Sequence, residues 1–145
     1  QLEIVRATNK PVIFHAVKAH TEMLSCLNAF GELPCGGVVH GFTGSAQLAE
    51  QYIRHGLHIG INGRWLYGGG RKVVEALTTI QLDHPLIESD SPDQSCERGA
   101  RNESISIIDA ARLIGRQKQL TTTTVLVQCS KNASRLFRDR APKGE

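Results

Sequence analysis

The sequence predicts an α/β fold in which parallel strands alternate with helices. Four short apolar runs recur along the chain and are expected to be strands, at residues 11–15, 37–40, 58–61 and 85–90. The runs are continuous rather than alternating, which is typical of strands buried on both faces. Apolar residues at helical spacing separate them, and this order favours a parallel sheet with right-handed crossovers.

The helices are expected between and after these strands, at residues 23–30, 48–57, 73–80 and 107–114. Gly31 is a suitable stop for the first helix, and Ser45 is a candidate N-cap for the second, which we expect to stop at Gly56. The threonine-rich segment 121–127 is ambiguous, because β-branched residues favour a strand. We favour a helix from about Thr124 onwards.

Composition limits the class of protein. The 145 residues, 40% of them hydrophobic, are enough for one domain, and we expect residues 1–145 to form a single domain. The net charge of +3 permits a nucleic-acid partner without indicating one, and the basic residues of segment 135–145 are expected in a solvated tail. No apolar run approaches the roughly 18 residues of a membrane span. Four scattered cysteines fit reduced thiols, which are typical of cytoplasmic proteins. We therefore expect a cytoplasmic protein, and we expect no membrane partner.

Three of the expected strands end on residues that can bind metal. These are His15, His40 and Asp90. In a parallel α/β barrel the carboxyl ends of all strands meet on one face, so the three side chains are expected in one pocket. Imidazole and carboxylate suit zinc and its first-row neighbours, and such a metal can acidify a bound water. Each residue alone is more typical of an ordinary core or loop position, whereas the three together fit a metal site as well, and both interpretations stay open.

The remaining histidines and Glu88 are expected to lie elsewhere. His20 is expected on a helix surface. Glu88 lies two positions before Asp90, and we expect these two side chains to point to opposite sides of the strand. On this interpretation Asp90 faces the pocket, while Glu88 pairs with a neighbouring base or caps the interior.

A loop rich in glycine, aromatic and basic residues follows the third expected strand, at residues 62–71. Arg64 could clamp a phosphate with two parallel hydrogen bonds, and Trp65 could offer a stacking surface. The glycines match no phosphate-loop or dinucleotide pattern, so a flexible lid is the alternative interpretation. Arg101 and Asn102, in the loop after Asp90, are similar substrate-binding candidates.

Several motifs together resemble one known family. PVIFHAVKAH, GVVHGFTGS, HIGING and LIESDSPD, in this order and at these intervals, resemble the TatD family of metal-dependent hydrolases and deoxyribonucleases. RNESIS and SKNASRLF resemble the closing segments of the family. The similarity covers nearly the whole chain.

The resemblance implies the C-terminal half of an amidohydrolase-like TIM (β/α)8 barrel, with four parallel strands and their helices. It implies two divalent metal ions, without distinguishing Mg²⁺, Mn²⁺ or Zn²⁺, and DNA or RNA ends as substrate. His15, His40 and Asp90 would be ligands, and Asp90 would also hold or deprotonate the attacking water. The His-x-His pair and the bridging glutamate of the family have no counterpart here, and a whole barrel needs about 250 residues.

Three functions are therefore compared. The first is a metal-dependent hydrolase of phosphodiester bonds, weak or inactive as this chain because three expected ligands are missing. The second is a non-catalytic remnant that self-associates through the open edges and apolar interior of a half-barrel. The third is a hydrolase of another ester, such as aminoacyl-RNA.

Overall fold

The computed structural model describes residues 1–97 and 99–137. Its strands form one parallel sheet in the order β1-β2-β3-β4, so each strand pairs with its neighbour along the chain. The strands are Val12–His15 (β1), Gly37–His40 (β2), Leu57–Asn62 (β3) and Pro85–Glu88 (β4). The predicted alternation of parallel strands and helices is confirmed.

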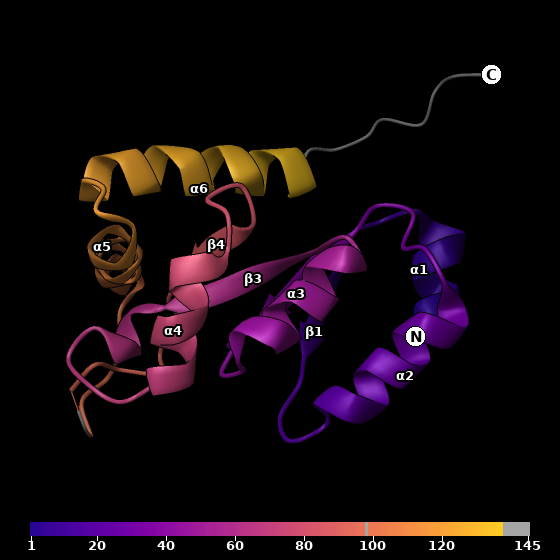
Figure 1. Cartoon of the computed structure of the whole chain (residues 1–145), viewed down its shortest axis with the longest axis horizontal. Coiled ribbons are helices and arrows are strands. Elements are labelled where there is room, and N and C mark those ends of the chain that lie inside the picture. Colours follow the sequence, from indigo (N-terminus) through magenta and orange to yellow (C-terminus); the bar gives the residue numbers. More distant parts are fainter. Residues whose placement is uncertain (98, 138–145) are drawn as a thin grey trace.

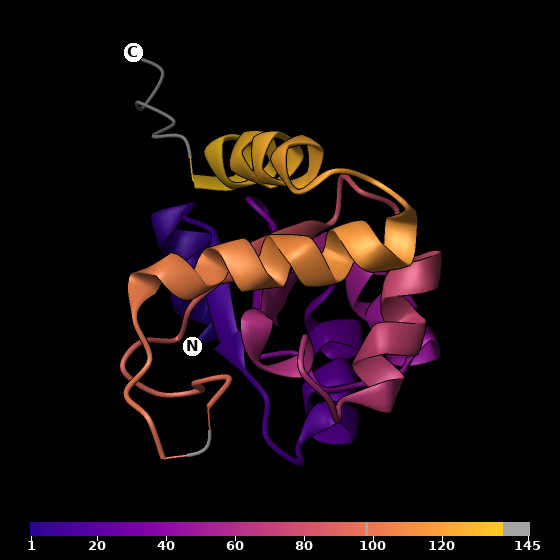
Figure 2. The same ribbon diagram turned by 90° about the vertical axis from the view of Figure 1, so that its left-hand side faces the viewer.

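A helix occupies every connection between strands: α2 (His20–Phe30), α3 (Ala46–Arg54) and α4 (Arg71–Thr79). Helix α1 (Leu2–Thr8) precedes β1, and α5 (Ile107–Lys118) and α6 (Thr122–Phe137) follow β4. Two short 3-10 helices are η1 (Gly63–Trp65) and η2 (Ser104–Ser106). Figure 1 shows α5 and α6 at the β4 end of the molecule and α1 and α2 at the opposite end. Turned by 90°, α5 runs across the front and α6 lies above it (Figure 2).

Capping decides where the helices begin and end. Ser45 caps α3, because its Oγ accepts the N–H of Leu48 at 3.4 Å, as predicted. Thr121 does the same for α6, with its Oγ1 accepting the N–H of Thr124 at 3.1 Å, so the threonine run opens a helix. The predicted second helix was too long at its end. It stops at Arg54, and Leu57 already belongs to β3, because Gly56 turns the chain at a φ of +76°.

The hydrophobic core lies between one face of the sheet and helices α3, α4 and α5. Strand residues on that face alternate with residues that point the other way. Fully buried members of this core include Val39, Tyr52, Leu57, Ile59, Ile61, Val73, Leu77 and Ile114. This packing fixes the carboxyl ends of the strands relative to one another.

The opposite face of the sheet carries the side chains that would line a barrel. Of its apolar residues, Ile13 is 61% exposed, whereas Val38 and Leu86 are only 4% and 6% exposed. The expected open apolar interior is therefore only partly present. It is exposed at β1 and closed towards β4.

The C-terminal helix differs from the expected solvated tail. Arg135 lies within α6, and its Nη2 donates to the carbonyl of Asp83 at 3.1 Å. Asn132, fully buried, donates from Nδ2 to the carbonyls of Leu82 at 2.9 Å and Pro85 at 3.0 Å. These bonds hold α6 against the start of β4. The rest of the expected tail, residues 138–145, lies outside the described residues.

None of the described helices combines the length and the apolar character needed to cross a bilayer. The four cysteines are free, and Cys129 is the buried one. A cytoplasmic location stays a prediction.

Candidate functional site

Two histidines meet at the carboxyl ends of β1 and β2. His15 and His40 are paired in the parallel register, so their side chains point to the same side of the sheet. Nδ1 of His15 lies 2.6 Å from Nε2 of His40, and the ring centroids are 4.7 Å apart. The structure thus brings together two of the three predicted ligands.

Asp90 lines the cavity that His15 and His40 also line, although Asp90 lies beyond the end of β4. The sequence placed the fourth strand at residues 85–90, whereas β4 ends at Glu88. Asp90 adopts a left-handed conformation with a φ of +60°, which turns the chain immediately after the strand. His15, His40, Arg64 and Asp90 all line an open cavity of about 680 Å³.

Glu88 also belongs to this region, which corrects the expectation that it points away from Asp90. Its Oε1 accepts the N–H of Gly41 at 2.6 Å and lies 4.0 Å from Nδ1 of His40. The physical reason is the alternation within β4: Glu88 lies two positions after Leu86 and therefore shares the sheet face that would line a barrel. The expected pairing of Glu88 with a neighbouring base is present, and that base is His40.

Burial raises the pKa of Glu88 to about 7. The N–H of Gly41 opposes this shift in the pKa, and the charge of Asp90 adds to it. Gly60 makes room for this arrangement on the neighbouring strand. A Cβ at Gly60 would lie 2.3 Å from Oε2 of Glu88 and 2.9 Å from Cα of His40. Only glycine fits there without displacing the carboxylate.

Arg64 reaches the cavity from η1, directly after β3. Asn62 caps η1 through an Oδ1 that accepts the N–H of Arg64 at 3.3 Å. The guanidinium lies 4.3 Å above the Trp65 ring, and Nη1 donates to Oε1 of Gln94. Gly70 packs against Trp65 so closely that a Cβ would come within 2.5 Å of the indole. Trp65, in the same loop, and Gln94, in the segment after β4, therefore both contact the Arg64 guanidinium.

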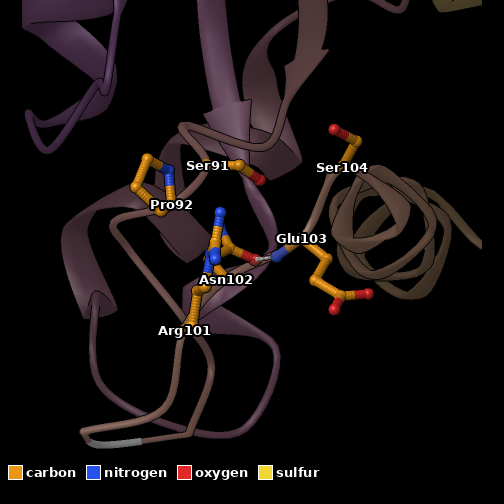
Figure 3. Close-up of a pocket in the computed structure, with 6 residues that line it drawn as sticks. All are labelled: Ser91, Pro92, Arg101, Asn102, Glu103 and Ser104. Carbon is orange, nitrogen blue, oxygen red and sulfur yellow. Dashed lines mark hydrogen bonds between the residues drawn. The ribbon is translucent and has the colours of Figure 1, made fainter.

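Arg101 and Asn102 lie in a neighbouring hollow, apart from the histidines. It has a volume of about 470 Å³ and is lined by Ser91, Pro92, Arg101, Asn102, Glu103 and Ser104 (Figure 3). Pro92 borders both hollows. Arg101 is exposed, whereas Asn102 is only 5% exposed. The structure therefore separates these two candidates from Arg64.

His20 differs from the surface histidine that was expected. Its Nδ1 lies 2.7 Å from the hydroxyl of the buried Tyr52, and burial lowers the pKa of His20. Helical spacing could not reveal this contact, because Tyr52 lies 32 positions further along the chain.

The donor types of the cavity suit a divalent cation, but the ligand set is incomplete. Imidazole and carboxylate are ligands that zinc and manganese accept. Within residues 1–97 and 99–137, however, no three His, Cys, Asp or Glu side chains are grouped closely enough to hold a metal ion. His15 and His40 meet as a pair, with Asp90 nearby in the same cavity.

Comparison with known proteins assigns the chain to a family. The family described as TatD related DNase matches residues 1–138. The chain belongs to the TatD family. It is 30% identical over 140 residues to the uncharacterized metal-dependent hydrolase YabD of Bacillus subtilis, covering 95% of this chain and 55% of that protein. It is also 34% identical over 93 residues to the deoxyribonuclease Tat-D of Schizosaccharomyces pombe, covering 63% of this chain and 29% of that protein.

Solved structures of the TatD family show the same fold. The Escherichia coli TatD homolog YjjV superposes with a TM-score of 0.84 and 26% identity, covering 97% of this chain and 54% of YjjV. The four parallel strands and their helices thus form part of an amidohydrolase-like TIM barrel. The chain spans about half the length of YabD and YjjV.

Proposed function

We propose that this chain provides part of the active site of a divalent-metal hydrolase that cleaves phosphodiester bonds at DNA or RNA ends. The observation that carries the proposal is the contact between His15 and His40 in a cavity shared with Asp90 and Arg64. The relative from S. pombe, named a deoxyribonuclease, supports the substrate class. The relatives named metal-dependent hydrolases support the use of a metal ion.

In this proposal His15, His40 and Asp90 are ligands, and further ligands come from outside the described residues. A bound divalent cation would acidify a water molecule and offset negative charge on the phosphate. The carboxylate of Asp90 orients the attacking water and accepts its proton. His15 and His40 must both present a neutral nitrogen to the site, since only an unprotonated imidazole nitrogen can be a ligand.

Arg64 binds the substrate phosphate in this proposal. Its guanidinium is held by Trp65 and Gln94, so little side-chain freedom is lost when a phosphate binds. One of its five N–H donors is used by Gln94, and the planar fork suits a phosphate oxygen pair. Arg101, exposed beside Pro92, would contact a more distant part of the nucleic acid.

The 145-residue chain alone should hydrolyse DNA ends weakly or not at all, because its described residues do not complete a ligand set. The test measures release of nucleotides from DNA and RNA ends, and cleavage of an aminoacyl-RNA ester, with Mg²⁺, Mn²⁺ or Zn²⁺. The deoxyribonuclease Tat-D of S. pombe serves as the comparison. Hydrolysis of DNA ends by the chain at the rate of that deoxyribonuclease would contradict the expected weakness.

Self-association is a second candidate, supported by the exposed edge of the sheet. Within the described sheet β1 pairs with β2 and has no strand on its other side. Ile13 and Val17, on and just after β1, are 61% and 64% exposed. An unpaired strand edge with apolar side chains can pair with another chain.

Sedimentation velocity tests this candidate. We expect the chain to sediment as a concentration-dependent dimer or larger species, and Ile13→Lys to shift it towards the monomer, because a charge blocks edge pairing. Ile105→Lys, which alters a similarly exposed residue in η2, outside the sheet, is the control. A wild-type chain that is monomeric at all concentrations would rule out this candidate.

A further inference from the structure

The carboxamide of Asn102 bridges the two sides of the turn that carries Asp90. Nδ2 donates to the carbonyl of Ser89 at 2.5 Å and to the carbonyl of Asp93 at 2.7 Å. The backbone N–H of Asn102 donates to the carbonyl of Pro92 at 2.9 Å. One residue, distant from β4 in sequence, thus contacts the chain on both sides of Asp90.

The turn that Asn102 bridges holds Asp90 in an unfavourable conformation. A φ of +60° lies in the left-handed region, which few residues with a Cβ occupy, although Asp does so more often than most. Such a conformation persists only where surrounding contacts determine it. The N–H of Asp93 donates to the carbonyl of Asp90 at 2.9 Å and closes the turn, but this bond lies within the turn itself. Asn102 provides the contacts from outside.

Asn102 has no free N–H for a substrate. Both hydrogens of its Nδ2 are engaged, and its Oδ1 accepts the N–H of Glu103 at 2.9 Å (Figure 3). The side chain is also almost fully buried. A direct contact with nucleic acid would break bonds that hold the turn, so the geometry favours a role within the protein.

We propose that Asn102 is a positioning residue that holds the Ser89–Asp93 turn and thereby aims the Asp90 carboxylate into the cavity with His15 and His40. The proposal rests on the proposed function in one respect, the role of Asp90 as a metal ligand. The local effect on the turn is independent of metal. These two parts are therefore measured separately.

The test compares Asn102→Asp with Asn132→Asp. Both residues are buried asparagines whose Nδ2 donates to two backbone carbonyls beside β4, Asn132 at its start and Asn102 after its end. The substitution keeps the side-chain shape and replaces both donors with an oxygen that repels the carbonyls. Asn132→Asp therefore reports the general cost of losing such a bridge.

The first readout is hydrogen exchange of the Asp93 amide, measured by NMR without metal. We expect about tenfold or faster exchange in Asn102→Asp than in the wild type, since the turn opens locally. Asn132→Asp should leave the Asp93 amide protected. Equal exchange of this amide in the two variants would overturn the proposal, whatever the metal measurements show.

The second readout is Mn²⁺ affinity by calorimetry. Asn102→Asp should weaken binding by about 10–100-fold, the usual effect of losing a residue that orients a ligand, and Asn132→Asp should not. If the wild-type chain binds no Mn²⁺ but the exchange result holds, the positioning role stands and the proposed metal role of Asp90 fails. Unchanged Mn²⁺ affinity in Asn102→Asp, or equal losses in both variants, would overturn the proposal.

Discussion

Replacing His40 with alanine should abolish most of the weak divalent-metal affinity that the partial ligand set of this chain provides. His40 lies between the His15 ring, at 2.6 Å, and the Glu88 carboxylate, at 4.0 Å, so its loss removes a donor from the centre of the cavity. The decrease should exceed the about 10–100-fold caused by losing an outer partner of a ligand. Calorimetric titration with Zn²⁺ and with Mn²⁺ measures it.

The control for this experiment is His55→Ala. His55 is the C-cap of α3. Because α3 leads into the start of β3, His55 lies near the amino ends of the strands, at the opposite edge of the sheet from His40. This variant should bind both metals as the wild type does. Equal affinity of wild type and His40→Ala would mean that the histidine pair is a local packing contact, and the proposed function would lose its main support.

Replacing Tyr52 with alanine should give the largest loss of stability, about 3–5 kcal/mol, as for other large aromatic residues in a core. Tyr52 is fully buried on α3 and packs edge-on against Phe42, with ring centroids 6.4 Å apart. Phe42 lies two positions after His40 and donates its N–H to the carbonyl of Gly60. The cavity left by alanine would therefore loosen the carboxyl end of β2. Urea unfolding followed by circular dichroism measures the change.

Tyr52→Phe separates packing from hydrogen bonding. It keeps the ring and removes only the hydroxyl, which lies 2.7 Å from Nδ1 of His20 and whose pKa burial raises to about 12. The expected loss is about 0.5–1.5 kcal/mol. If Tyr52→Phe destabilised the chain as much as Tyr52→Ala, the contact with His20 rather than the ring would anchor α2 to α3.

The prediction that His15 and His40 lie close together is confirmed, because it used the register of parallel strands, whereas their role as metal ligands stays a prediction. His15 and His40 each end a continuous apolar run, and parallel pairing brings such ends to the same edge. The prediction failed for Glu88, although the alternation of a strand already places residues 88 and 90 on one face. The correct period would have included Glu88 in the site from the sequence alone.

Other parts of the site depend on contacts between residues that are distant in sequence. Gln94 supports Arg64 across 30 positions, and Asn102 bridges carbonyls 9 and 13 positions away. Local propensity assigns both residues to a loop and says nothing about their partners. The place of Asn102 in the loop after Asp90 suggested a substrate-binding role, which its carboxamide, fully engaged in hydrogen bonds within the protein, does not favour.

The sequence by itself determined the alternation of strands and helices, the parallel sheet and the two histidines at its edge, because apolar periodicity and capping act within a few residues. The tertiary structure alone decided how far β4 extends, how Asp90 turns towards the cavity and which side chains hold it there. Those features depend on hydrogen bonds and burial between segments that meet only when the core is packed. His15 and His40 could be predicted from their own strands, whereas Asp90 depends on Asn102.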